Sequence, residues 1–266
     1  MSSSLKGRLA VVTGGASGIG AACCRSLAEL GAEIVIVDFN DDLASSVADT
    51  IRASGGKAHA LALDVRDADA IEAMAARIEK EIGPVDILVT SAGVIQAPLP
   101  PEELPLDNWD LVVAVDQRGV YLSCLAFGRR MAHRGAGSIV NIASVAGMRS
   151  MPLHSYAPAK AAVISMTESL AAEWGRSGVR VNAVAPGYTL TPALQAAIDS
   201  GQRDPSDLAG NSALGRLVRP EEIADAIAFL VSDRAAAVTG ITLPVDAGWL
   251  VAPSWHTYGG IRPKRG

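Results

Sequence analysis

Residues 13–20, Thr13-Gly14-Gly15-Ala16-Ser17-Gly18-Ile19-Gly20, follow the apolar run 8–13 and precede a segment of helical periodicity at 18–30. A glycine-rich turn between a first strand and a first helix lets the backbone approach a diphosphate. The helix N-terminus then stabilises the negative charge of that group. The position of the turn in the chain, more than its glycine spacing, predicts a dinucleotide-binding loop.

Outward from this turn, short β-branched runs alternate with helical patterns as far as residue 245. Several of these runs are continuously apolar, which indicates strands covered on both faces. The alternation predicts an α/β fold: one Rossmann-type, doubly wound parallel sheet of about seven strands with helices on both faces, a single domain over 1–266. Strands are predicted at 8–13, 33–38, 57–62, 85–89, 137–142, 179–184 and 241–245, and helices at 18–30, 41–54, 68–82, 107–134, 155–177 and 220–232.

Three stretches depart from the alternation: 93–106, which is rich in proline, 186–219, and 249–266. Long irregular segments in a compact domain are typically functional loops or disorder, so 186–219 is predicted to be a substrate loop. The last stretch, 249–266, is a C-terminal tail that holds Trp249, Trp255 and Tyr258 in a chain with only 4% aromatic residues. Clustered rings favour a covering surface, so we expect the tail to pack on a neighbouring subunit.

Composition excludes several classes of protein. The formal charge of −5 leaves no basic footprint, so neither nucleic acid nor a membrane surface is an expected partner. No apolar run approaches the roughly 20 residues of a membrane span, and the N-terminus carries no signal segment. Three cysteines, two of them adjacent, favour a reducing cytoplasm over a disulfide framework, and no Cys or His spacing predicts a metal site.

The second predicted strand ends at Asp38, 18 residues after Gly20. A carboxylate at this point accepts hydrogen bonds from adenosine ribose hydroxyls and repels a 2′-phosphate. Neither Ser17 nor Phe39 supplies a compensating cation. The pattern predicts NAD in preference to NADP, and the alternative is that Asp38 is only a turn or capping residue.

Tyr156 and Lys160 are four residues apart in a helical segment, so their side chains share a face. An ammonium ion about 4 Å from a phenol stabilises the phenolate by up to about 4 kcal/mol at an effective dielectric near 20. The pair therefore suits proton transfer at neutral pH. Ser144, just beyond the fifth predicted strand, is placed to hold a substrate oxygen. The alternative is a surface Tyr–Lys pair, which Ser144 and the glycine loop make less favourable.

Over residues 6–248 the sequence resembles the short-chain dehydrogenase/reductase family. The resemblance rests on Thr13-Gly14-x-x-x-Gly18-x-Gly20, Asp64-Val65, Ala92-Gly93, Asn141-Ile142-Ala143-Ser144, Tyr156-x-x-x-Lys160 and Pro186-Gly187. It implies Tyr156 as general acid/base, Ser144 as partner of the substrate oxygen, and Lys160 bound to the nicotinamide ribose. It also implies a homo-oligomer, a tetramer more than a dimer. The implied cofactor contacts are Gly14, Ser17, Gly18, Ile19, Gly20, Asp38, Phe39, Asp64, Val65, Ala92, Gly93, Tyr156, Lys160, Val184, Pro186, Gly187, Thr189 and Thr191.

The sequence departs from the family pattern at three places: Thr90-Ser91 before Ala92-Gly93, Asp246-Ala247-Gly248 near the end, and Asp116. Asp116 aligns with the asparagine that completes the family's catalytic tetrad and helps to hold a proton-relaying water. A carboxylate there can still accept a hydrogen bond from water. It would also pair with Lys160 and weaken its effect on Tyr156. We predict an active enzyme with a shifted pH optimum or a reduced rate.

The implied reaction is hydride transfer between a nicotinamide and a carbon bearing a hydroxyl or carbonyl group. A mixed pocket of Gln96, Arg149, His154 and Tyr188, with Met148, Met151 and loop 192–214, favours a small polyol, sugar or other secondary alcohol. One alternative is a 3-oxoacyl-carrier-protein reductase-like enzyme, which should carry a basic patch for its acidic carrier. Arg129, Arg130, His133 and Arg134 form a basic cluster, but its position at a helix end favours a role in offsetting the helix dipole. The other is a non-catalytic NAD-binding sensor.

Overall fold

The structure is a computed structural model that describes residues 4–262. Seven parallel strands form one sheet in the order β3-β2-β1-β4-β5-β6-β7, which confirms the predicted Rossmann-type α/β fold. The strand order reverses between β1 and β4, so the loops at their carboxyl ends diverge there and leave a crevice. The strands are β1 Leu9–Thr13, β2 Glu33–Asp38, β3 Ala58–Ala62, β4 Ile87–Thr90, β5 Gly137–Ile142, β6 Val179–Pro186 and β7 Thr242–Val245.

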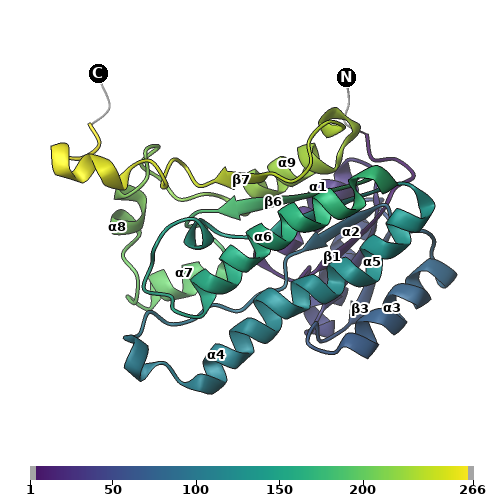
Figure 1. The fold of residues 1–266 in the computed structure, drawn as a ribbon, viewed down its shortest axis with the longest axis horizontal. Coiled ribbons are helices and arrows are strands. Elements are labelled where there is room, and N and C mark those ends of the chain that lie inside the picture. The colour runs from purple at the N-terminus through teal and green to yellow at the C-terminus, as the bar shows by residue number, and fades with distance from the viewer. Residues whose placement is uncertain (1–3, 263–266) are drawn as a thin grey trace.

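Helices cover both faces of the sheet, and β1 shows how the sequence divides between them. Ala10 and Val12 pack under α1, α2 and α9, whereas Leu9 and Val11 face α3, α5 and α6. Figure 1 shows α5 and α6 side by side across the near face. These helices are α1 Gly18–Glu29, α2 Asp41–Ala53, α3 Ala68–Glu81, α5 Val120–Arg134, α6 Tyr156–Trp174 and α9 Pro220–Val231.

The single helix predicted at 107–134 is interrupted. α4 (Leu106–Val112) leads into a π-helical turn, Val113–Gly119, and then into α5. The turn buries Asp116, and a π-turn inside an α-helix is often found at a functional site. Residues 106–134 are together long and apolar enough to cross a membrane, but more than half of the apolar window is buried inside the protein. The segment is therefore a helix of the protein core that packs against the sheet.

Segment 186–219 was predicted to be irregular, yet it contains two short helices, α7 (Pro192–Asp199) and α8 (Pro205–Gly210). Each begins with an oxygen-bearing residue and a proline: Thr191 accepts a hydrogen bond from Leu194 N, and Asp204 accepts one from Ser206 N. These are ordinary N-terminal helix signals, which the sequence carries in its Thr-Pro and Asp-Pro pairs.

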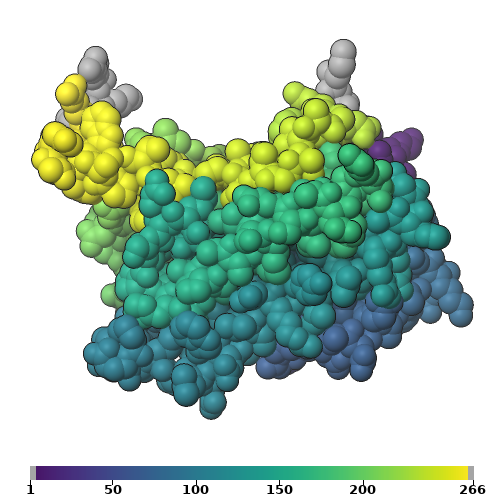
Figure 2. Space-filling view, viewed as in Figure 1, coloured from purple at the N-terminus to yellow at the C-terminus, as the bar shows by residue number. Residues whose placement is uncertain are grey.

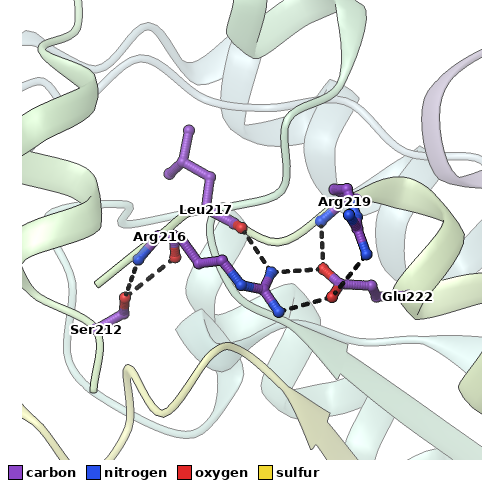
Figure 3. A network of polar contacts seen from close by, with 5 residues as sticks. All are labelled: Ser212, Arg216, Leu217, Arg219 and Glu222. Atoms are coloured by element: carbon purple, nitrogen blue, oxygen red, sulfur yellow. Dashed lines mark hydrogen bonds and ion pairs between the residues drawn. The ribbon is translucent and has the colours of Figure 1, made fainter. Parts of the chain in front are cut away.

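A polar network fastens the end of this segment to α9 (Figure 3). Arg216 donates to both carboxylate oxygens of Glu222 at 2.7 and 2.8 Å, and Arg219 N donates to the same carboxylate. The hydrogen bonds from Arg216 are the main cause that lowers the pKa of Glu222 to about 2. Ser212 Oγ donates to Arg216 O and accepts from Arg216 N, which closes the turn between α8 and α9.

The chain then runs through the edge strand β7, in which Pro244 pairs with Ala185. The tail projects from the body of the molecule (Figures 1 and 2) and contains a 3₁₀ turn, Pro253–Tyr258. Trp249 does not reach outward, because it packs edge-to-face on Tyr188 with 6.1 Å between ring centroids. Tyr258 is 87% exposed. Residues 263–266 of the predicted tail lie outside the described residues.

Candidate active site

A cleft of about 530 Å³ opens at the carboxyl ends of β1, β2 and β4, where the strand order reverses. This is the place where an open α/β sheet binds its ligand. Most of the residues that the sequence predicted for a cofactor line this one cleft, and so does Asp116, which was predicted as a catalytic residue. The cofactor residues in the lining are Gly14, Ser17, Gly18, Ile19, Asp38, Phe39, Asp64, Val65, Ala92, Gly93, Tyr156, Lys160 and Thr191.

The glycine loop is tightly packed. A Cβ on Gly14 would lie 2.5 Å from the backbone of Ala92, and Gly14 has a φ of +67°. A Cβ on Gly20 would lie 2.0 Å from Gly14 O. Helix α1 begins at Gly18, its N-cap residue Ser17 makes no side-chain capping hydrogen bond, and its first turn holds no acidic residue. A backbone this close to the open cleft, with the partial positive charge of a helix end, fits the diphosphate of a dinucleotide.

Asp38 lies at the end of β2 and is hydrogen-bonded to the same loop. Its two carboxylate oxygens accept hydrogen bonds from Ala16 N and Asn40 N, each at 3.0 Å. A carboxylate has about four acceptor positions, so two remain for the ribose hydroxyls of a bound nucleotide. Phe39 beside it is 78% exposed and lines the cleft.

Arg66 also lines the cleft, although the sequence did not predict a role for it. Its guanidinium donates to both oxygens of Asp64, with the shortest contact at 2.6 Å. These hydrogen bonds lower the pKa of Asp64. Its position two residues after Asp64 in the sequence could have indicated that Arg66 lies at the cleft. Pro192 and Ala193, from the predicted substrate loop 192–214, also line the cleft. Further lining residues, for which the sequence predicted no contact, are Leu63, Ser91, Val94, Ile95, Leu111, Val115 and Ile142.

Tyr156, Lys160 and Asp116 meet at one end of the cleft. Lys160 Nζ lies 3.1 Å from Asp116 Oδ2, donates to Ile142 O at 3.0 Å, and lies 5.5 Å from the centre of the Tyr156 ring. Asp116 is fully buried, Lys160 is 3% exposed, and Val94 N donates to the other carboxylate oxygen at 2.8 Å. The expected pairing of Asp116 with Lys160 is therefore present.

In the Asp116–Lys160 pair, burial and electrostatic attraction shift each pKa in opposite directions. Burial alone would lower the pKa of Lys160, but the Asp116 carboxylate and Tyr156 more than offset it, so the pKa lies above its usual value. Burial also raises the pKa of Asp116, against the attraction of Lys160 and the Val94 N–H group. The lysine therefore stays protonated across the working pH range, and the carboxylate offsets part of its charge.

Ser144 belongs to segment 142–147, which contacts Lys160 through Ile142 and Gly147. Ile142 O accepts from the lysine, and Gly147 approaches the Lys160 backbone so closely that a Cβ would lie 2.7 Å from it. Ser144 Oγ accepts a hydrogen bond from Ala146 N at 3.1 Å. Ser144 is not among the residues that line the main cleft, and neither are Gly20, Val184, Pro186, Gly187 or Thr189.

The four predicted substrate residues are dispersed. Arg149 and His154, with Met148 and Met151, line a second cavity of about 370 Å³ rather than the main cleft. Tyr188 packs on Trp249, as described above. Gln96 is buried and hydrogen-bonded to Ser155. Within residues 4–262, no group of three His, Cys, Asp or Glu side chains is placed to hold a metal ion.

A family model described as enoyl-(acyl carrier protein) reductase matches residues 14–250, nearly the whole fold. The chain belongs to the short-chain dehydrogenase/reductase family. This confirms the resemblance carried by the glycine loop and the Tyr–Lys pair.

Two curated relatives are dehydrogenases of hydroxy compounds. Cis-4-hydroxycyclohexanecarboxylate dehydrogenase of Sinomonas cyclohexanicum is 44% identical, with 91% of this chain and 96% of the relative covered. D-threitol dehydrogenase of Mycolicibacterium smegmatis is 41% identical, with 93% and 94% covered. The chain is accordingly an oxidoreductase of the class that acts on CH–OH groups.

Two solved structures superpose closely. A Brucella melitensis protein described as ribose-5-phosphate isomerase is 51% identical, with a TM-score of 0.94 over 99% of this chain and 100% of that one. A gluconate 5-dehydrogenase of Burkholderia cenocepacia, in complex with NADP and tartrate, is 36% identical, with a TM-score of 0.89 over 94% and 98%. The cleft and the NADP-bound relative of the same fold together indicate an NAD(P) cofactor.

Proposed function

We propose that this protein is an NAD-dependent dehydrogenase that interconverts a secondary alcohol and its ketone, with Tyr156 as the general acid/base. The observation that carries the proposal is the meeting of Tyr156 and Lys160 in the cleft that the glycine loop enters. A phenol beside a buried ammonium ion is suited to exchange a proton with a substrate hydroxyl.

Bound NAD supplies the hydride acceptor at its nicotinamide ring, and the chain supplies the proton transfer. Lys160, fixed by Asp116 and Ile142 O, stabilises the phenolate of Tyr156, which takes the proton of the substrate hydroxyl as that oxygen becomes a carbonyl. Ser144 donates its hydroxyl hydrogen to the same substrate oxygen. In the reverse direction Tyr156 returns the proton.

The preference for NAD rests on Asp38. Its carboxylate lines the cleft, and both cations that line the cleft among the described residues are already paired: Arg66 with Asp64, and Lys160 with Asp116. A 2′-phosphate on the adenosine ribose would meet a like charge there. Since the gluconate 5-dehydrogenase binds NADP, this preference distinguishes the chain from a relative of the same fold.

For the substrate we propose a small polyol, sugar or related hydroxy compound. Support comes from the relatives named for D-threitol and for a hydroxylated ring carboxylate. A carrier-bound acyl chain is less favoured, because each arginine of the basic cluster on α5 is paired with a glutamate of α3. Arg129 and Arg130 pair with Glu72, and Arg134 pairs with Glu79.

We also infer a homotetramer. Large apolar side chains remain exposed along α4 and α5, and exposed apolar patches are typical of an interface. Light scattering behind size exclusion tests this. The exposed residues are Leu106, Trp109, Leu111, Tyr121 and Leu125.

The cytoplasm is the proposed location, because Cys23, Cys24 and Cys124 are free and buried. Burial raises the pKa of the Cys23 and Cys124 thiols to about 12, which keeps them unreactive.

The test is a reduction assay with NAD⁺ and NADP⁺ over D-threitol, galactitol, gluconate and cis-4-hydroxycyclohexanecarboxylate. We expect turnover with NAD⁺, and a loss of about 10²- to 10⁴-fold in Tyr156→Phe with unchanged NAD⁺ affinity. Tight NAD⁺ binding with no turnover of any alcohol would instead support the non-catalytic sensor. Full activity of Tyr156→Phe would refute the role of the tyrosine.

A further inference from the structure

The π-turn Val113–Gly119 makes contacts in two directions. On one side Asp116 Oδ2 lies 3.1 Å from Lys160 Nζ, at the proposed catalytic end of the main cleft. On the other side Arg118 Nη1 donates a hydrogen bond to Arg66 O at 2.7 Å. Residues two positions apart in a helical turn point to nearly opposite sides, so a single turn can make both contacts. Arg118 is exposed and does not line the cleft itself.

Loop 64–66 follows β3 and lies beside the end of β2. Leu63 N donates to Asp38 O at 2.8 Å, and residues 64–66 line the main cleft together with Asp38. Asp38 is the proposed acceptor for the adenosine ribose. Three strands, β2, β1 and β4, separate β3 from β5, whose last residue holds Lys160. Loop 64–66 is therefore at the adenosine end of the cleft, away from the catalytic lysine.

The polar groups of loop 64–66 mostly bind one another. Arg66 N and Nε donate to Asp64 Oδ1 at 2.9 and 3.0 Å, and Arg66 Nη2 donates to Asp64 Oδ2 at 2.6 Å. Asp67 N donates to Asp64 O at 3.1 Å. These bonds fix the shape of the turn and the orientation of the Asp64 carboxylate, but they do not attach the turn to the rest of the cleft.

The π-turn supplies that attachment. Within residues 4–262, the hydrogen bond from Arg118 is the only one that joins loop 64–66 to the chain outside residues 64–67. Gly119 adds a close contact, because a Cβ on it would lie 2.9 Å from Val65 Cγ2. A hydrogen bond from a charged donor is stronger than one between neutral groups. Without it, the loop would have to be ordered when a nucleotide binds, which lowers affinity.

We propose that Arg118 is a positioning residue for the cofactor: through Arg66 O it holds loop 64–66 in the conformation that receives the adenine base. This inference rests on the proposed NAD-dependent function and adds to it a residue that lies outside the cleft. The effect should be confined to the adenosine half of the cofactor, because Asp116 and Ile142 O hold Lys160 independently of Arg118.

The experiment measures binding of two halves of the cofactor, so it does not depend on turnover. ADP-ribose contains the adenosine half and is measured by calorimetry. Nicotinamide mononucleotide lacks that half and is measured by ligand-observed NMR. The variants are Arg118→Met, which removes the guanidinium, and Arg118→Lys, which keeps a charged donor. The control is Arg176→Met, because Arg176 is exposed after α6 and does not line the cleft, so it makes the same change in net charge elsewhere.

Arg118→Met should weaken the binding of ADP-ribose by at least about tenfold, equivalent to about 1.4 kcal/mol, and leave the affinity for nicotinamide mononucleotide unchanged. Arg118→Lys should recover part of the loss, and Arg176→Met should bind both ligands like the wild type. The unchanged affinity for the mononucleotide also shows that Arg118→Met is folded.

Two results would overturn the inference. One is an affinity for ADP-ribose that is the same in Arg118→Met and the wild type. The other is an equal loss of affinity for both ligands, which would assign Arg118 a general role in stability. A wild type that binds neither NAD⁺ nor ADP-ribose would instead refute the dinucleotide-dependent function and, with it, the role of Arg118.

Discussion

Replacing Asp116 with asparagine should move the pH dependence of alcohol oxidation toward lower pH. Asp116 Oδ2 is 3.1 Å from Lys160 Nζ, which is 5.5 Å from the Tyr156 ring centre, and together these distances place the carboxylate at most about 9 Å from the ring. Two unit charges about 9 Å apart interact by about 1.8 kcal/mol at an effective dielectric near 20. In the wild type this interaction disfavours the phenolate, and the variant removes it.

The direction of the shift follows from the form of Tyr156 that oxidation needs. The phenolate is the base, so a change that stabilises the phenolate extends alcohol oxidation to lower pH. Loss of the negative charge stabilises the phenolate by about 1.8 kcal/mol, so the acid side of the profile should move to lower pH. The alkaline limb should move in the same direction. The carboxylate helps to raise the pKa of the buried Lys160, so that pKa falls when the carboxylate is removed.

The assay is the pH profile of kcat/KM, at constant ionic strength, for wild type, Asp116→Asn, and the control Asp225→Asn. Asp225 is exposed on α9, so the control makes the same change in net charge away from the cleft. The asparagine keeps an oxygen for the Val94 N–H group, which preserves the local backbone. A profile of Asp116→Asn that matches wild type would show that the carboxyl carries no charge in the active enzyme, and would refute the reasoning.

Three further outcomes can be checked directly. Asp38→Asn keeps an acceptor for Ala16 N but removes the charge, so kcat/KM with NADP⁺ should rise at least about tenfold relative to that with NAD⁺; no change in the ratio would count against the role of Asp38. Gly20→Ala forces a Cβ to within 2.0 Å of Gly14 O and should weaken NAD⁺ binding by more than tenfold in calorimetry, whereas Gly175→Ala, with open space around it, should not. Truncation after Ala252 should shift the oligomer toward smaller species in light scattering, and unchanged size and kinetics would contradict the proposed tail contact.

The sheet and the cleft were predictable because their signals are local. Each strand is a short apolar run, and the glycine loop, Asp38 and the Tyr–Lys pair each lie at or just after a strand end or on one helix face. The substrate side was harder to predict. Arg149 and His154 are close to Tyr156 in sequence, yet they line another cavity. Sequence proximity does not show on which side of a turn a side chain lies.

Two features lacked a sequence signal altogether. The π-turn at 113–119 adds a residue to a helical turn without disturbing the apolar pattern, so the segment reads as one continuous helix. The hydrogen bonds from Ser155, at the start of α6, to Gln96 join residues 59 positions apart, and no local pattern reports such a contact. By contrast, α7 and α8 were missed although their Thr-Pro and Asp-Pro starts were readable.

The edge strand β7 has a consequence for the behaviour of the protein at high concentration. The carbonyl groups of Ile241 and Val245 point toward β6, where they accept hydrogen bonds from Ala183 N and Gly187 N. Backbone polar groups alternate in direction along a strand, so those of the even-numbered residues of β7 point to the open edge. Pro244 is one of these, and it has no N–H group to offer there. A second strand that paired with this edge would lack a backbone N–H donor in the middle of β7. This missing donor protects the sheet edge from strand addition and fibrillar aggregation.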